Sequence, residues 1–303
     1  MDEWLSMVGE AGQGLPPELR HRVEEMKDGT GKPALLVRGL GLSTVDLPPT
    51  PGHWRDCRPL DSDSPTLRHE TALILFGQAL GESFGYASLQ NGRLIHHLLP
   101  IAGAETDQSG HGSKATLGWH TEDAFTPFRA DHLALVGMRN DDEIATTVCG
   151  IDALRGLDPR DESILKEPRF LVVPDDEHVR GRSRSEGPSI LPPEDEGGVR
   201  LPILGEGPRG RRLIIDSVYM SPTDAEAGKA FGRASELIDA SLERISVGPG
   251  EILILDNRRV VHGRESFRPR FDGSDRWLLK LSVAESLSGS SIYRRPHRDR
   301  VLR

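Results

Sequence analysis

The sequence has only two cysteines and no long apolar run. Cys57 and Cys149 leave room for one disulfide but exclude a disulfide-rich scaffold, which favours the cytoplasm. The longest apolar runs, at 73–76 and 252–255, fall far short of the roughly 20 residues of a transmembrane helix. The acidic N-terminus also lacks the basic-then-apolar pattern of a signal peptide. We therefore expect a cytoplasmic protein without a membrane partner.

An excess of positive charge is also missing. Lysine and arginine total 38 against 47 acidic residues, which gives a net charge of −9 and makes nucleic acid a poor candidate partner. Hydrophobic residues (36%) and charged residues (28%) are at the level of ordinary globular proteins. The 33 glycines and 22 prolines predict many turns without reaching the level of a disordered chain.

Short strand patterns separated by turn residues dominate the chain. Helices are expected at 17–28, 69–80 and 224–243. Strands are expected at 34–37, 93–100, 116–121, 132–139, 144–149, 169–173, 199–204, 212–216, 251–255, 259–262 and 276–284. This pattern predicts a mainly β sandwich or barrel with helices on its outer faces.

We expect residues 1–303 to form a single domain, with 1–68 as an N-terminal extension of it. Residues 174–198 have a different character, because acidic, arginine and proline-rich stretches follow one another there without an apolar period. Such a segment is either a plain surface loop or a mobile lid over a site. We expect the lid.

The most informative segment is 118–125, Gly-Trp-His-Thr-Glu-Asp-Ala-Phe. Side chains of a strand alternate between its faces, so His120 and Glu122 point the same way. An imidazole beside a carboxylate supplies two ligands of the 2-His-1-carboxylate site found in non-haem Fe(II) oxygenases. His262 is the candidate third ligand, because it lies at a strand end just before Gly263, where the imidazole can reach a cavity.

An iron site of this kind leaves positions open for a co-substrate such as 2-oxoglutarate. The distal carboxylate of 2-oxoglutarate would suit an arginine, whose planar fork binds carboxylates through two hydrogen bonds. Arg276 opens an apolar strand whose alternation puts Arg276 and Lys280 on one face. Arg268 and Arg270 are the rival candidates, in a loop with Pro269.

Two longer motifs around these residues resemble those of a known family. Residues 120–125 with 129–131 are similar to the first metal motif of clavaminate-synthase-like Fe(II)/2-oxoglutarate oxygenases, and 257–264 with 269–278 to the second. The nearest members hydroxylate amino acids for antibiotic biosynthesis, such as asparagine oxygenase and the arginine hydroxylase of the viomycin pathway. The resemblance runs from about residue 70 to the end. It implies a double-stranded β-helix, a jelly-roll barrel with flanking helices, as one oxygenase domain.

The resemblance also implies roles for individual residues. His120, Glu122 and His262 would hold Fe(II), and Arg276 would bind the co-substrate 2-oxoglutarate, with O₂ as the oxidant. Thr147 matches the threonine whose hydroxyl assists that arginine, and Thr146 is the near alternative.

Further residues are implied in substrate binding. Gln90 and the free oxygen of Glu122 would hold the ammonium of the amino acid, and Asp216 would read its side chain or merely close a turn before Ser221. Lys280 stands where the family commonly has a second arginine, for the α-carboxylate of the substrate. Thr126 also departs from the family, which commonly has histidine there.

The implied activity is hydroxylation of a polar or basic L-α-amino acid at C3 or a nearby carbon. Alternatives are desaturation or cyclisation of a carrier-bound or modified amino acid, or a non-catalytic metal-binding barrel. A zinc hydrolase would need His-Glu-x-x-His, and a zinc deaminase would need Pro-Cys-x-x-Cys. Neither motif occurs in the sequence.

Overall fold

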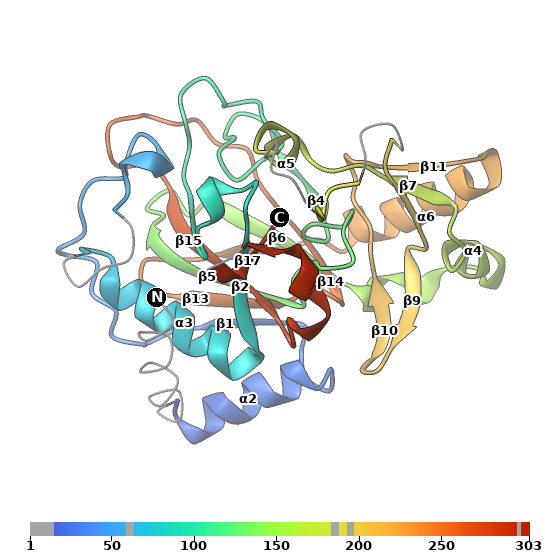
Figure 1. The fold of residues 1–303 in the computed structure, drawn as a ribbon, viewed down its shortest axis with the longest axis horizontal. Helices are drawn as coiled ribbons and strands as arrows, with labels where there is room; N and C mark the ends of the chain where they lie inside the picture. Colours follow the sequence, from blue (N-terminus) through green and yellow to red (C-terminus); the bar gives the residue numbers. More distant parts are fainter. Residues whose placement is uncertain (1–14, 59–63, 183–187, 193–196, 296–297) are drawn as a thin grey trace.

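The computed structural model describes residues 15–58, 64–182, 188–192, 197–295 and 298–303. Over this part of the chain the fold is mainly β, as expected, with helices on the outside (Figure 1). Segments 1–14 and 59–63 of the expected extension, and 183–187 and 193–196 of the expected lid, lie outside the described residues. Among the described helices, none combines the length and the apolar character that crossing a membrane requires.

The larger sheet contains the most apolar strands. Its order is β1 (Ala34–Val37), β13 (Ile252–Asp256), β5 (His132–Arg139), β15 (Trp277–Ala284), β2 (Glu82–Tyr86), β17 (Arg298–Leu302) and β16 (Arg294–Arg295), with β3 (Ile95–Leu98) also pairing β15. Strand β13 is buried on both faces. Ile252 and Ile254 pack into an outer apolar cluster, whereas Leu253 and Leu255 pack into an inner one. This alternation of side chains explains why the strand is continuously apolar.

Helix α3 (Leu67–Leu80) covers the outer face of this sheet, and α2 (Pro17–Lys27) packs against α3 (Figure 1). The spacing of Leu73, Phe76 and Leu80 gives α3 an apolar stripe, and all three side chains are buried. The helix therefore shields one side of the larger sheet, and its other side is left to face the smaller sheet.

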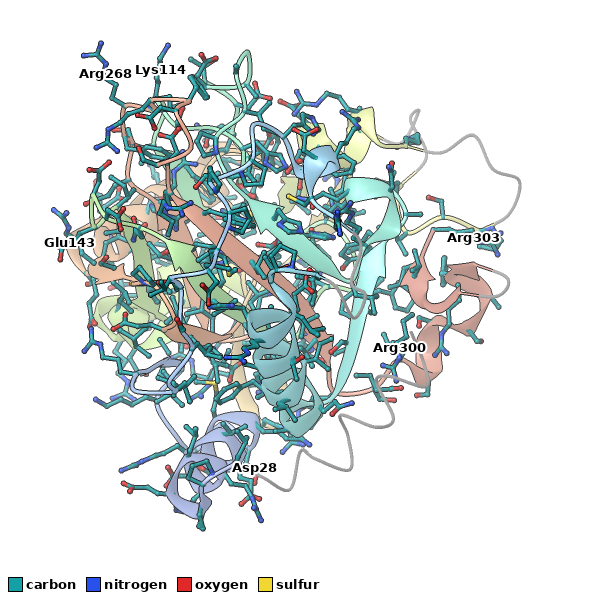
Figure 2. All side chains as sticks on the ribbon, turned by 90° about the vertical axis from the view of Figure 1, so that its left-hand side faces the viewer. Asp28, Lys114, Glu143, Arg268, Arg300 and Arg303 are labelled. Carbon is teal, nitrogen blue, oxygen red and sulfur yellow. The ribbon has the colours of Figure 1, made fainter. Side chains whose placement is uncertain are left out.

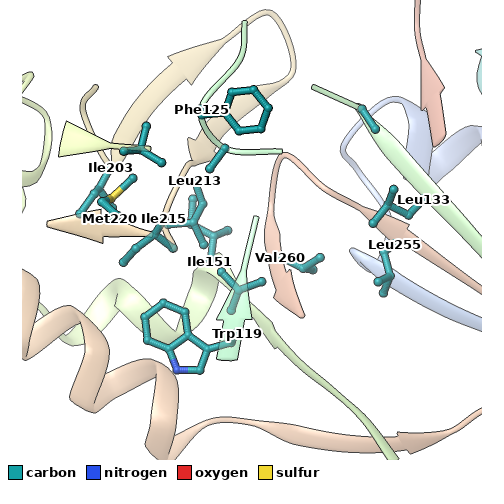
Figure 3. Packing of buried hydrophobic residues seen from close by; sticks show 14 of the residues in the cluster. Trp119, Phe125, Leu133, Ile151, Ile203, Leu213, Ile215, Met220, Leu255 and Val260 are labelled. Carbon is teal, nitrogen blue, oxygen red and sulfur yellow. The ribbon is translucent and has the colours of Figure 1, made fainter. Parts of the chain in front are cut away.

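The smaller sheet carries residues of the predicted site. Its order is β12 (Glu243–Ser246), β6 (Ala145–Gly150), β14 (Val260–Arg264) and β4 (Leu117–His120). Leu133 and Leu255 of the larger sheet share one apolar cluster with Val260 and Trp119 of the smaller (Figure 3). Trp119 also donates from Nε1 to Asp239 Oδ1 at 2.6 Å, which ties β4 to α6 (Ala225–Ala240).

The remaining strands and α-helices belong to neither of these two sheets. They are β7 (Phe170–Val172), β8 (Val199–Leu201) and β11 (Met220–Pro222), the hairpin of β9 (Leu204–Gly207) and β10 (Gly210–Leu213), and the helices α4 (Pro159–Leu165) and α5 (Asp176–Arg180). Cys57 and Cys149 are both free and buried, so they do not form the disulfide that their number allows.

Several expected boundaries are wrong. The expected strand 199–204 is two strands, β8 and β9, which break at Pro202, where the backbone has no N–H to donate. The expected helix 224–243 ends at Ala240, and Glu243 begins β12. The expected lid begins with α5, whose N-cap Asp175 accepts a hydrogen bond from the backbone N–H of His178 at 2.9 Å.

Three buried histidines lead to a prediction about acid stability. Burial lowers the pKa values of His96, His97 and His132 to about 3. The unfolded chain takes up these protons near pH 6.5, whereas the folded chain does not, so stability falls as the pH drops below 6.5. Each ring should cost about 1.4 kcal/mol of unfolding free energy per pH unit. Denaturant unfolding between pH 7.5 and 5.5 measures this slope.

The control variant is His132→Gln. The Nε2 of His132 accepts a hydrogen bond from Arg258 at 3.1 Å, which a glutamine oxygen can replace without titrating. In this variant the slope of the unfolding free energy against pH should fall by the contribution of one ring, about 1.4 kcal/mol per pH unit. His120 and His178 have raised pKa values, so their contribution has the opposite sign and falls mainly above pH 6.5, whereas the slope of the three histidines with lowered pKa values develops below it. A stability that is flat between pH 7 and 5.5 would contradict the prediction.

Candidate active site

Pairing of β4 with β14 brings two histidines together. His262 lies opposite His120 in this antiparallel pair, and their ring centroids are 4.6 Å apart. The register shifts between His262 and Arg264, at Gly263. A Cβ at Gly263 would lie 2.6 Å from the carbonyl oxygen of Leu117, so a side chain there would push the strands apart.

Glu122 reaches the same point from the turn after β4. The fully buried Asn257 holds its backbone, because Asn257 Oδ1 accepts from the N–H of Glu122 at 2.8 Å and Nδ2 donates to its carbonyl at 3.2 Å. Glu122 Oε2 lies 3.5 Å from His120 Nε2 and 3.1 Å from His262 Nε2. The structure therefore places all three candidate ligands together.

These side chains fit a metal ion. One ligand atom from each of His120, Glu122 and His262 lies within 4.8 Å of the others. His120 Nδ1 lies 2.8 Å from the Gly118 carbonyl and donates to it, so the neutral ring keeps its proton on Nδ1 and can offer the Nε2 lone pair to a metal ion. Two imidazole nitrogens and one carboxylate with open positions are the donor set of a non-haem Fe(II) centre.

The site keeps Glu122 ionised. Burial alone would raise the pKa of this carboxyl, but the charge of Lys280 and the hydrogen bonds of both histidines hold it well below its usual value. Burial favours the neutral form of His120, yet the hydrogen bond and charge of Glu122 outweigh it and raise the pKa of His120 to about 9. Burial lowers the pKa of His262. A metal cation would therefore compete with a proton for His120.

Arg276 is a buried cation on the wall of the same cavity. Its side chain donates from Nη2 to Thr146 Oγ1 at 3.1 Å, while its Nε is buried without a hydrogen-bond partner. Burial and the nearby charge of Arg264 lower the pKa of Arg276 to about 9. No carboxylate of the described residues pairs with it. A buried guanidinium in this state is suited to an anionic ligand.

Thr146, the near alternative, contacts Arg276, and Thr147 does not. Neighbouring residues of β6 face opposite sides, so Thr146 is buried beside the cavity, whereas Thr147 lies beneath Gly263 of β14. The placement of Thr147 beside the arginine is therefore wrong by one residue.

The rival arginines do not line the cavity. Arg268 is exposed and projects from the surface near Lys114 (Figure 2). Arg270 is also exposed, and its Nη2 lies 2.6 Å from Asp142 Oδ1. Among the three candidate arginines, the cavity therefore receives only Arg276.

Three candidate substrate residues line the cavity, and each already has a contact. Both ends of the Gln90 amide bond the backbone of His97, each at 3.0 Å. Asp216 Oδ1 accepts from the N–H groups of Val218 and Tyr219, each at 2.7 Å, so it closes a turn as well as facing the cavity. Lys280 Nζ donates to Glu122 Oε1, so Lys280 does face the metal ligands.

Helix α5 brings residues to the site that the sequence did not suggest. His178 is fully buried: its Nε2 lies 2.9 Å from Asp123 Oδ1, and its Nδ1 lies 2.7 Å from Ser88 Oγ. Asp123, His178 and Asp175 could also hold a cation, but both ring nitrogens of His178 are engaged. We interpret this cluster as a tether for α5. The only available signal was the Asp175 N-cap three residues before the histidine.

Helix α5 also carries Glu177 to the cavity wall. Glu177 Oε1 lies 3.3 Å from His111 Nε2. Burial would raise the pKa of Glu177, but the hydrogen bond and charge of His111 lower it to about 2. The cavity therefore contains an ionised carboxylate that lies apart from the metal ligands.

Comparison with known proteins places these features in a family. Residues 64–282 match the model of the taurine catabolism dioxygenase TauD, TfdA family. The L-ornithine/L-arginine 3-hydroxylase of Catenulispora acidiphila is 35% identical over 306 residues, which cover 96% of this chain and 88% of the relative. The enduracididine β-hydroxylase of Streptomyces hygroscopicus is 35% identical over 305 residues, which cover 95% and 87%.

A solved structure shows the same fold. The non-haem iron oxygenase OrfP, crystallised with Fe, succinate and (3S)-hydroxy-L-Arg, superposes with a TM-score of 0.89 at 32% identity, over 99% of this chain and 90% of that one. These matches confirm the resemblance to Fe(II)/2-oxoglutarate oxygenases that the two metal motifs indicated. The chain belongs to the TauD/TfdA family of dioxygenases.

Proposed function

We propose that the protein uses Fe(II), 2-oxoglutarate and O₂ to hydroxylate a basic L-α-amino acid at C3 or a nearby carbon. The observation that carries the proposal is the convergence of His120, Glu122 and His262 beside the unpaired guanidinium of Arg276. The relatives support the substrate class, since they are named as hydroxylases of ornithine, arginine and enduracididine.

The architecture suits this function. We infer that the larger and smaller sheets are the two halves of a distorted double-stranded β-helix, a jelly-roll barrel that is open at the metal site. The chain would then be one oxygenase domain, with 1–68 as its extension and 174–198 as a lid that begins with α5. The common apolar cluster between the two sheets supports a single domain.

In this proposal different residues bind the metal and the co-substrate. His120, Glu122 and His262 would hold Fe(II), which supplies the oxidation of an unactivated C–H bond when O₂ and 2-oxoglutarate are bound. Arg276 binds the distal carboxylate of 2-oxoglutarate and Thr146 orients the guanidinium. The tautomer of His120, fixed by the Gly118 carbonyl, keeps Nε2 available to the metal.

The substrate side chain lies near Asp216 in this proposal. Asp216 neighbours His120 through a β-bridge, and Oδ2 accepts no hydrogen bond from the described residues. A partly desolvated carboxylate favours a cationic or donor side chain, because leaving it unpaired is costly. Lys280 would turn from Glu122 to the α-carboxylate of the substrate once a metal cation neutralises Glu122.

The metal assignment predicts the behaviour of three variants. Replacement of His120, Glu122 or His262 by alanine should abolish iron retention and turnover while thermal unfolding stays cooperative, because the wall of a cavity tolerates truncation better than a packed core. Iron content after gel filtration and succinate formation measure the effect. His21→Ala, an exposed histidine on α2, is the control. Retained substrate oxidation in His262→Ala would remove the assignment.

The clamp assignment predicts a specific KM effect. Arg276→Lys keeps the charge but loses the planar fork, and a charge-assisted bond contributes about 1.5–3 kcal/mol, so the KM for 2-oxoglutarate should rise about 10- to 100-fold. Steady-state kinetics with varied 2-oxoglutarate measure it, and Arg270→Lys is the exposed control. If Arg270→Lys shows the increase and Arg276→Lys does not, Arg276 is the wrong residue.

The charge of Asp216 can be tested separately from the hydrogen bonds that Asp216 makes in its turn. Asn at this position still accepts the two N–H bonds of the turn through its Oδ1, so Asp216→Asn removes only the charge. The KM for a cationic amino acid should rise about tenfold or more, since a hydrogen bond to a charged group contributes about 1.5–3 kcal/mol. Decay of 2-oxoglutarate without substrate should stay nearly unchanged. An unaltered KM for the cationic amino acid would defeat the proposal.

A further inference from the structure

Glu177 stands at the boundary between two cavities. One is the active-site cavity, which Glu177 lines together with Gln90, His96 and Lys280. The other lies on the outer side, where Glu177 meets His111. Glu177 is 29% exposed, and among the described residues its Oε2 accepts no hydrogen bond. One carboxylate oxygen of α5 is thus available to a ligand.

Glu177 shares its partner with Gln90. His111 Nδ1 lies 3.2 Å from the Leu99 carbonyl, and the other ring nitrogen, Nε2, lies 3.4 Å from the amide nitrogen of Gln90 and 3.3 Å from Glu177 Oε1. One ring nitrogen therefore has two neighbours, and it contacts only one of the two carboxylate oxygens of Glu177. Among the described residues, Glu177 Oε2 has no such contact and can accept a hydrogen bond from a ligand.

Gln90 is a weak acceptor for an ammonium group here. Its Oε1 accepts the N–H of His97 and its Nε2 donates to the His97 carbonyl, so the amide is committed to β3. The neighbouring Glu177 offers a full negative charge instead. This corner of the cavity already holds an ammonium, because Lys280 Nζ contacts Glu122 there.

We propose that Glu177 is a specificity-determining residue that binds the α-ammonium of the substrate opposite the free oxygen of Glu122. The proposal rests on the function proposed above and names the group that holds the amino-acid end of the substrate. Binding of the ammonium would also fix α5 over the cavity, because His178 joins this helix to Asp123, the residue after Glu122. Substrates without an α-ammonium then lack this contact and bind more weakly.

The test compares substrates with and without the ammonium. Glu177→Gln preserves shape and removes charge. Its KM for L-arginine should rise at least tenfold, and likewise for L-ornithine. The inhibition constants of 5-guanidinopentanoic and 5-aminopentanoic acid, which lack the α-ammonium, should stay within about twofold of wild type. Glu236→Gln, an exposed isosteric change on α6, is the control. Glu177→Asp, which keeps the charge, should recover part of the affinity.

The outcomes separate this proposal from a structural role and from the proposed function itself. If Glu177 only pins α5 through His111, His111→Gln should match Glu177→Gln and both should weaken the des-amino acids equally, which would overturn the proposal. We expect His111→Gln to keep a near wild-type KM, because Glu177 remains. Equal KM values in wild type and Glu177→Gln also overturn it while the proposed function stands. Absence of turnover of any basic amino acid by the wild type would overturn both.

Discussion

The antiparallel pairing of β4 with β14 is the constraint on which the site depends. It sets His120 opposite His262, although the two lie 142 positions apart in the sequence. Gly263 permits the close approach and Asn257 aligns the backbone of Glu122. These contacts belong to the scaffold, so the ligand geometry is held by strand pairing and buried hydrogen bonds. Pre-organisation of this kind lowers the cost of collecting three ligands around one ion.

Unbalanced buried charge is the second feature of the cavity. Arg276 has no acidic partner among the described residues, whereas Asp216 and Glu177 keep carboxylate oxygens that accept no hydrogen bond from them. Each such group is costly without a ligand. The arrangement leaves a positive position for the co-substrate and negative positions for a cationic amino acid. These groups therefore lower the stability of the ligand-free fold and serve to bind ligands, as is common at functional sites.

Local patterns predicted much of this site, and tertiary contacts determined the rest. Strand alternation predicted that His120 and Glu122 point the same way and that Arg276 and Lys280 share one face. All four residues line one cavity, although Glu122 lies in the turn after β4 and Arg276 directly precedes β15. The choice between Thr146 and Thr147 depends on the register of β6 against β14, which no local pattern reveals. Glu177 and His178 lie in a segment without an apolar period, so α5 and its contacts were not expected. The hydrogen bonds between the Gln90 amide and the His97 backbone depend on the conformation of the loop at Gln90, which no local pattern predicts.

The most direct test of the account is succinate formation over a panel of free L-amino acids with Fe(II), 2-oxoglutarate and O₂. The account predicts that basic amino acids such as L-arginine or L-ornithine stimulate succinate release well above the uncoupled rate. Each succinate should be matched by one product carrying one added oxygen atom at C3 or a nearby carbon. Equal stimulation by leucine or valine, or succinate release that no amino acid stimulates, would contradict it.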